Sequence, residues 1–212
     1  MSTVLPEHGY FRQASFLLSV PEVHLLPPDT GAEIAVVGRS NVGKSTVLNA
    51  LCDQQGLART SRTPGRTQQI VVFDLAQGRR LLDLPGFGYA AVRRTLREQW
   101  GETIPRVLNE RRSLIGLLLL ADARFPLKQE ERDLLQWCVT ERVRVQVVLN
   151  KTDKVNRQVA IQALRDVSTL LDASQLDTVP LLVSATAKSG IGELRGRLHA
   201  WYADSLKEGP GS

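Results

Sequence analysis

A glycine-rich stretch at residues 38–46 has the residue types and the spacing that bind phosphate groups. It is a complete GxxxxGK[ST] pattern, made of Gly38, Arg39, Ser40, Asn41, Val42, Gly43, Lys44, Ser45 and Thr46. The two glycines allow the backbone to curl so that N–H groups face phosphate oxygens, and Lys44 supplies a positive charge to the outer phosphates. The Ser45 hydroxyl is a suitable ligand for Mg²⁺.

A second motif can contact the metal and the terminal phosphate. It consists of Asp83, Leu84, Pro85 and Gly86 at the end of a short apolar run, which predicts that it ends a strand. There Asp83 can hold Mg²⁺ through water, and the Gly86 N–H can touch the last phosphate of a nucleoside triphosphate.

The base is specified by a third motif, Asn150, Lys151, Thr152 and Asp153, after another apolar run. A carboxylate at its last position can accept hydrogen bonds from both N1–H and the 2-amino group of guanine, whereas adenine offers no such pair of donors. The loop of Ser184, Ala185 and Thr186 follows the last predicted strand, where its backbone can contact the guanine carbonyl. These motifs predict a site for GTP or GDP with Mg²⁺.

A basic loop separates the first predicted helix from the second predicted strand. Residues 59–68 contain three arginines, no acidic residue and no apolar residue, so this stretch cannot pack as core. One interpretation is a switch segment that closes over the γ-phosphate when Thr63 or Thr67 reaches Mg²⁺. The other is a mobile surface loop, and both can hold for one segment.

These motifs need strands and helices in alternation, and the hydrophobic pattern provides them. Strands are predicted at residues 33–37, 69–75, 79–84, 114–121, 143–149 and 179–183. Helices are predicted at residues 44–53, 92–110 with a break near Pro105, 129–139, 157–171 and 191–204. Residues 114–121 are apolar on both faces, which favours a central parallel strand. The order predicts an α/β fold with a mostly parallel, doubly wound sheet and one antiparallel hairpin at its edge.

The chain is expected to form one domain with two short appendages. Residues 1–30 carry four prolines and no sustained period, so they should form an irregular N-terminal arm. Residues 31–205 should form the GTP-binding domain, and residues 206–212 a disordered tail. Cys52 and Cys138 lie far apart without a CxxC pattern and should be reduced core thiols.

The composition excludes several classes of protein. With 212 residues, 42% hydrophobic and 23% charged, the chain is an ordinary globular protein and not a disordered one. Its longest apolar run, residues 114–121, is too short to cross a bilayer, and its N-terminus does not have the pattern of a secretion signal. We therefore expect a cytoplasmic protein that does not bind membranes.

The net charge of +5 points to an acidic partner. Residues 93–112 contain six arginines and three acidic residues, and the arginines of residues 59–68 should extend this basic face. One interpretation is contact with RNA phosphates, which would make the affinity fall with salt. The other is a solvated helix with pairs such as Arg94 and Glu98.

Four motifs together resemble one family. The sequences GRSNVGKST, TPGRTQ, DLPGFGYA and NKTD, in this order after a proline-containing arm, are similar to the EngB family of bacterial ribosome-assembly GTPases. The resemblance covers residues 10–204. Two departures are small: NKTD stands where TKxD is common, and SAT where a less regular serine pair is frequent. Neither affects Lys151 or Asp153.

The resemblance implies a three-layer P-loop GTPase fold and a slow GTP-hydrolysing switch. It assigns the switch threonine and Mg²⁺ ligand to Thr67, within a nucleotide-binding stretch of Gly65, Arg66, Thr67, Gln68 and Gln69. The implied partners are the precursor of the large ribosomal subunit and its rRNA, with a consequent role in growth, cell division and septation. We expect a monomer.

The source of catalytic charge for hydrolysis is left open. In Ras-type GTPases a glutamine after the DxxG motif orients the attacking water, but Phe87 occupies that position here. Candidate catalytic groups are Lys44, Thr67, Gly86 and Asn41. In related GTPases, an asparagine at the position of Asn41 helps to hold a K⁺ ion. Arg66 or a ribosomal group could supply the charge instead.

The sequence leaves two alternative functions. A P-loop phosphotransferase is disfavoured because NKTD selects guanine and no acceptor-binding lid is visible. A switch acting on a non-ribosomal protein partner is the other alternative, although the chain lacks the lipidation motifs of membrane-traffic switches.

Overall fold

The computed structural model describes residues 9–58, 69–88 and 102–207. Its strands are β1 (Ser15–Val20), β2 (Ala32–Gly38), β3 (Ile70–Asp74), β4 (Arg79–Asp83), β5 (Leu114–Asp122), β6 (Val145–Asn150) and β7 (Leu181–Leu182). Its helices are α1 (Lys44–Leu51), α3 (Thr103–Glu110), α4 (Gln129–Thr140), α5 (Arg157–Ala173) and α6 (Ile191–Lys207). Short 3₁₀ helices are η1 (Gly9–Gln13), η2 (Val23–Leu25) and η3 (Thr152–Lys154).

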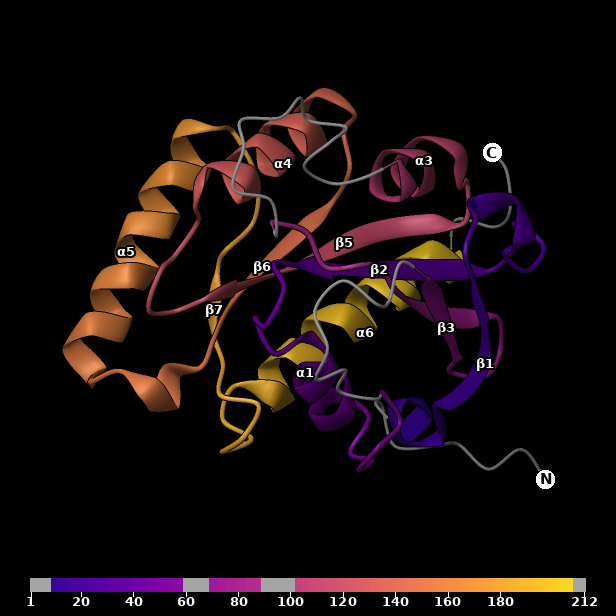
Figure 1. The fold of residues 1–212 in the computed structure, drawn as a ribbon, viewed down its shortest axis with the longest axis horizontal. Coiled ribbons are helices and arrows are strands. Elements are labelled where there is room, and N and C mark those ends of the chain that lie inside the picture. Colours follow the sequence, from indigo (N-terminus) through magenta and orange to yellow (C-terminus); the bar gives the residue numbers. More distant parts are fainter. Residues whose placement is uncertain (1–8, 59–68, 89–101, 208–212) are drawn as a thin grey trace.

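All seven strands belong to one sheet, in the order β1-β3-β4-β2-β5-β6-β7 (Figure 1). Five neighbouring strands of the sheet, β4, β2, β5, β6 and β7, are mutually parallel, whereas β3 is antiparallel to both of its neighbours, β1 and β4. The mostly parallel sheet, the β3–β4 hairpin and the central position of β5 are therefore confirmed.

The hairpin does not form the edge of the sheet, which corrects one expectation. Residues 15–20, placed in an irregular arm, form β1 and pair along β3, from Ser15 with Asp74 to Val20 with Ile70. The register shifts between Phe16 and Leu18, and Pro21 follows the strand. A six-residue strand at the edge of a sheet pairs with one neighbour only, so it needs no long alternating pattern. The prolines near it favour irregular structure, so the sequence did not predict this strand.

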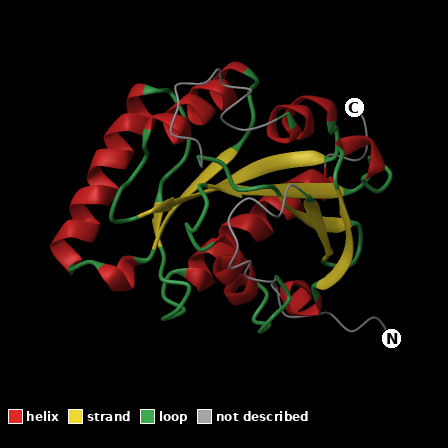
Figure 2. Ribbon diagram, viewed as in Figure 1, coloured by secondary structure: helices red, strands yellow, loops and turns green. Residues whose placement is uncertain are grey.

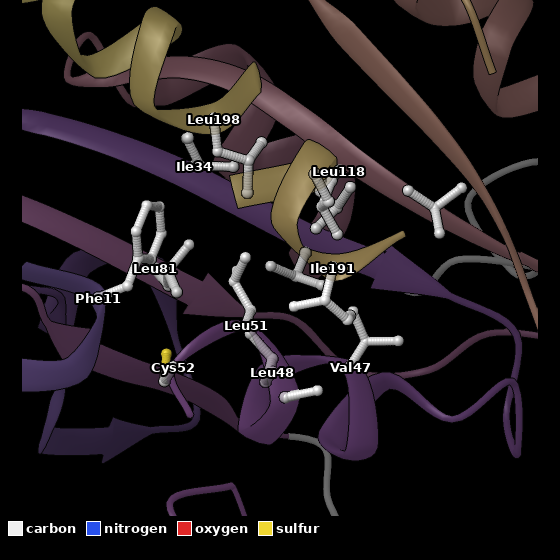
Figure 3. Packing of buried hydrophobic residues seen from close by; sticks show 14 of the residues in the cluster. Phe11, Ile34, Val47, Leu48, Leu51, Cys52, Leu81, Leu118, Ile191 and Leu198 are labelled. Carbon is white, nitrogen blue, oxygen red and sulfur yellow. The ribbon is translucent and has the colours of Figure 1, made fainter. Parts of the chain in front are cut away.

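Helices cover both faces of the sheet, which confirms the three-layer arrangement (Figures 1 and 2). Neighbouring residues of β2 face opposite layers: Ile34 packs with α1 and α6, whereas Ala35 packs with α3, α4 and α5. Figure 3 shows the first layer, where Leu48 and Leu51 of α1 lie with Leu198 of α6. Successive side chains of a strand point to opposite faces of the sheet, so this alternation determines which helix layer each residue of β2 contacts.

The last helix closes the first layer against the N-terminal residues. The Tyr202 hydroxyl donates to the Arg80 carbonyl oxygen at 2.7 Å, and the rings of Tyr10 and Tyr202 meet edge to face at 6.0 Å. A Cβ on Gly116 of β5 would lie 2.3 Å from the Trp201 ring, so a glycine is required where α6 crosses the sheet. Helix α6 continues to Lys207, so residues 206 and 207, expected in a disordered tail, are helical.

Other differences are local. Pro105 lies in the first turn of α3, where a proline is tolerated because its missing N–H needs no partner, and it does not break the helix. Strand β7 has only two residues. Cys52 and Cys138 are buried free thiols, as expected, and burial raises the pKa of each to about 12. The expected basic helix over residues 92–101 lies outside the described residues.

No helix among the described residues combines the length and the apolar character needed to cross a membrane.

Candidate functional site

The GxxxxGK[ST] loop joins β2 to α1. Gly38 ends β2, and Gly43 precedes α1 with a φ of 95°, a conformation that L side chains rarely adopt. A Cβ on Gly43 would also lie only 2.6 Å from the Asn150 Nδ2 atom. The first turn of α1 therefore presents its N–H groups beside Lys44 and Ser45, the arrangement that receives phosphate oxygens.

The DxxG motif lies directly against this loop. The Ser40 N–H donates to the Phe87 carbonyl oxygen at 3.0 Å, and the Phe87 N–H donates to the Gly38 carbonyl oxygen at 3.3 Å. A Cβ on Gly86 would lie 3.2 Å from the Ser40 Oγ atom, which leaves little space beside the backbone. The structure thus brings Gly86 to the phosphate-binding loop, as the sequence predicted.

Lys44 and Asp83 form an ion pair at the centre of the site. Only 16% of the Lys44 side chain and 11% of the Asp83 side chain are exposed. Burial raises the pKa of Asp83 above its usual value, and the Lys44 ammonium acts in the opposite direction. The buried pair places one cation and one carboxylate at the carboxyl ends of β2 and β4.

The side chains available here fit a hydrated Mg²⁺ ion. Ser45 follows Lys44 in the first turn of α1, so its hydroxyl and the Asp83 carboxylate lie at the same end of the sheet. One hydroxyl ligand, with a carboxylate that contacts the ion through water, leaves the remaining positions to water and phosphate oxygens, which Mg²⁺ prefers. Across residues 9–58, 69–88 and 102–207, no group of three or more His, Cys, Asp or Glu side chains could hold a metal alone.

Asn150 joins three loops of the site. Its Nδ2 atom donates to the Val42 carbonyl oxygen at 2.9 Å, and its Oδ1 atom accepts from the Ala185 N–H at 3.2 Å. The residue is 2% exposed. Because both ends of one buried amide are used, Asn150 holds the phosphate-binding loop and the loop of residues 184–186 in a fixed relation.

Lys151 and Asp153 follow at the end of β6. Lys151 has a φ of 67°, and its ammonium donates to the Asn41 carbonyl oxygen at 2.5 Å and pairs with Asp122 at 3.0 Å. The Asp153 carboxylate accepts from the Ser184 hydroxyl at 2.6 Å, and this hydrogen bond lowers the pKa of Asp153. An ionised carboxylate oriented in this way can accept hydrogen bonds from two donors of a guanine base.

Asp122 is a site residue that the motifs did not reveal. It ends β5, and its carboxylate also takes a bidentate contact from Arg124, at 2.9 and 2.7 Å. Although burial raises the pKa of Asp122, the hydrogen bonds from Arg124 and Lys151 lower it to about 2. A charged residue directly after the longest apolar run was the available signal, because it had to lie at the carboxyl edge of the sheet.

Arg39 links the phosphate-binding loop to α4. Its guanidinium pairs with Glu130 at 2.6 Å and contacts the position that a Cβ on Gly88 would occupy. The neighbouring Glu131 is 1% exposed, and its Oε2 atom has no hydrogen-bond partner among the described residues. Burial raises the pKa of Glu131 to about 7, although Arg39 lowers it.

Four of the predicted site residues lie outside the described residues: Gly65, Arg66, Thr67 and Gln68. Gln69 is described, and its side-chain oxygen accepts from the Ser19 hydroxyl of β1 at 2.6 Å. Phe87 is 3% exposed and packs in the core, so its side chain does not face water.

The fold and the arrangement of motifs define a P-loop GTPase. Solved structures of similar fold include a probable GTP-binding protein EngB, with a TM-score of 0.65, 22% identity and coverage of 82% of this chain and 100% of that one. The elongation factor SelB of Methanococcus maripaludis, in complex with the GTP analogue GppNHp, has a TM-score of 0.57 and 16% identity, covering 81% of this chain and 34% of that one.

Sequence comparison identifies the family. The model of the family described as 50S ribosome-binding GTPase matches residues 33–151. The probable GTP-binding protein EngB of Hamiltonella defensa is 41% identical over 198 residues, which cover 93% of this chain and 97% of that protein. The protein of the same name from Escherichia coli O6:K15:H31 is 41% identical over 194 residues, covering 92% of each chain. The chain belongs to the EngB family of GTP-binding proteins.

Proposed function

We propose that this GTPase acts as a switch in assembly of the large ribosomal subunit. In its GTP form it docks on the precursor subunit and contacts rRNA, and it leaves after hydrolysis. The observation that carries the proposal is the match of residues 33–151 to a family described as 50S ribosome-binding. A contribution to growth, cell division and septation would follow from this role, as would a cytoplasmic location and action as a monomer.

The nucleotide would be held by the groups that the structure brings together. Lys44 and the first turn of α1 would bind the phosphates, and Asp153 with Ser184 would bind the guanine base. Mg²⁺ would be held by Ser45, by Asp83 through water and by Thr67. Thr67 would report the γ-phosphate, because only the triphosphate lets the switch segment close on the metal.

A nucleotide-exchange design tests the switch. Wild-type protein should co-sediment with precursor large subunits in the presence of GppNHp and much less with GDP. The Asp153→Asn variant should lose this association with GppNHp and regain it with the xanthine analogue XppNHp, since xanthine offers the complementary group. Equal sedimentation of wild type with both guanine nucleotides would refute the switch. Absence of sedimentation with either one would favour a non-ribosomal partner.

The same preparation measures the rate of unassisted hydrolysis. With GTP and Mg²⁺ alone, the products should be GDP and inorganic phosphate, released slowly because Phe87 cannot orient water. A rate of about 10⁻³ s⁻¹ or less is expected. A much faster rate without ribosomes would contradict the assignment of a missing catalytic group.

Potassium is the proposed source of missing catalytic charge, through Asn41. Asn41 lies at the turn of the phosphate-binding loop with a φ of 64°. Its backbone carbonyl oxygen accepts from the Lys151 ammonium at 2.5 Å, so the side-chain amide oxygen is the group that would bind K⁺. K⁺ should accelerate hydrolysis relative to Na⁺ at equal ionic strength, and Asn41→Ala should remove the difference while nucleotide binding remains. Identical rates in both salts, with and without ribosomes, would leave Arg66 or a ribosomal group as the source.

A further inference from the structure

The loop that joins β5 to α4 lies at the same end of the sheet as the nucleotide motifs (Figure 1). It carries an exposed aromatic side chain. Phe125 keeps 59% of its surface exposed. Within the described part of the chain, only Phe16 in β1 is a comparably exposed aromatic residue. A single exposed apolar ring is common on protein surfaces, so exposure alone does not mark a site. Among the described residues, Phe125 differs from Phe16 in that the structure gives it two cations over its ring.

The loop holds Phe125 in a fixed position. The Phe125 N–H donates to the Asp122 carbonyl oxygen at 2.9 Å, and the adjacent Arg124 is fixed by its bidentate contact with the Asp122 carboxylate. At the other end, Arg132 Nε donates to the Leu127 carbonyl oxygen at 2.9 Å. A ring held in this way loses little conformational entropy when it binds a partner.

Two cations flank the ring. The Arg124 guanidinium carbon lies 5.7 Å from the ring centroid, and the Lys128 ammonium nitrogen lies 5.4 Å from it. The nearby acidic groups are paired, Asp122 with Arg124 and Lys151, and Glu130 with Arg39, so Lys128 is the cation over the ring that no carboxylate of the described residues pairs with. The surface around Phe125 therefore combines one apolar plane with positive charge.

We propose that Phe125 and Lys128 form a platform for an unpaired RNA base: the base stacks on the ring, the Lys128 ammonium moves from over the ring to a flanking phosphate, and Arg124 keeps its contact with Asp122 and so fixes the loop. An aromatic plane beside cations matches the two parts of a nucleotide, the flat base and the negative phosphate. This inference rests on the proposed function, in which rRNA of the precursor subunit is the partner, and it assigns the contact to residues that the structure describes.

Three substitutions separate stacking from charge. Phe125→Ala should weaken association with precursor subunits about 5- to 100-fold, the range that loss of one stacked base produces. Phe125→Trp should preserve association, and Lys128→Ala should lower the magnitude of the salt slope by about one. Phe16→Ala, at a similarly exposed phenylalanine in β1, is the matched control and should leave association unchanged. GTP affinity of every variant should equal that of wild type.

A fluorescence measurement identifies the partner as RNA. The Phe125→Trp variant should show quenching on addition of a 12-nucleotide single-stranded RNA of mixed sequence that wild-type protein does not show. Duplex RNA should quench less, because its bases are already stacked. Quenching would support the platform even if wild-type protein failed to sediment with subunits, a failure that would refute the proposed function alone.

Two outcomes would overturn the platform. In one, Phe125→Ala associates with precursor subunits as tightly as wild type does, while the proposed ribosomal function stands. In the other, Phe125→Ala loses association but the tryptophan variant shows no quenching with single-stranded RNA. That combination would assign the surface to a protein contact.

Discussion

Replacing Asn150 with alanine removes the only side chain that the described structure shows bonded to both the phosphate-binding loop and the loop of residues 184–186. The change deletes an amide that donates to the Val42 carbonyl oxygen and accepts from the Ala185 N–H. Both backbone groups are at a buried position, since Asn150 is 2% exposed. The cavity left by the amide is small, so water would not fully replace it.

The magnitude follows from the two backbone groups left without a partner. Each unsatisfied buried group costs about 1–3 kcal/mol, so the free energy of unfolding should fall by about 2–6 kcal/mol. In a domain of this size 1 kcal/mol shifts the melting temperature by about 2–4 °C, so the melting temperature should fall by about 4–24 °C. The affinities for GDP and GTP should decrease by similar factors, because Asn150 positions loops and does not contact the γ-phosphate.

Urea unfolding and nucleotide titration of the same variants measure both effects. Asn156→Ala is the matched control, because Asn156 caps α5 by accepting from the Val159 N–H at 2.9 Å, outside the site. It should cost about 1 kcal/mol of stability and leave nucleotide affinity unchanged. Asn150→Thr should be intermediate, since a hydroxyl can serve one of the two partners. The reasoning is refuted if Asn150→Ala weakens GTP much more than GDP, or if its stability equals that of wild type.

Three other predictions use groups of the same site. Asp153→Asn should weaken GTP and GDP together by about 2–4 kcal/mol and improve xanthine-nucleotide binding; unchanged GTP affinity in a titration would contradict the base assignment. The pKa of Asp122 is lowered from 3.8 to about 2, so its ion pairs stabilise the protein fully above pH 3.8, and this stabilisation is lost as the pH falls toward 2. In urea unfolding, the stability difference between wild type and Asp122→Asn should therefore shrink from pH 6 to pH 3. Burial raises the pKa of Glu131 from 4.5 to about 7, so the folded state loses stability as the pH rises through this range. Glu131→Gln should therefore stabilise the protein by about 2 kcal/mol at pH 8 and much less at pH 5. An equal gain in stability at pH 5 and pH 8 would contradict the buried charge.

The central strands and the motifs at their ends could be predicted from sequence because one physical cause determines both. Strands β2, β5 and β6 are largely buried on both faces, so apart from Glu33 and Gln146 their inner residues are apolar, and polar motifs mark where each strand ends. Parallel pairing then brings Gly38, Asp122 and Asn150 to one edge. The contact between Lys44 and Asp83 follows from this arrangement.

Other features depend on long-range contacts that leave a weak local signal. Strand β1 is stabilised by β3, about fifty residues away, and its own six residues do not alternate. The role of Asp122 depends on Arg124 and Lys151, and the exposed position of Phe125 depends on the turn that Asp122 closes. Neither residue type nor spacing predicts such contacts, because they form only after strand pairing has brought the carboxyl ends of the strands together.

The position of α6 has a consequence for synthesis of the chain. This last helix covers Ile34 and Leu118, and it meets Phe11 and Tyr10 near the other end of the sequence. Until residues 191–207 have left the ribosome, α1 alone of the two helices on this face, α1 and α6, can cover that apolar layer of the sheet. The layer therefore stays partly exposed during synthesis until α6 has emerged, and a chaperone can bind the exposed apolar surface in that interval.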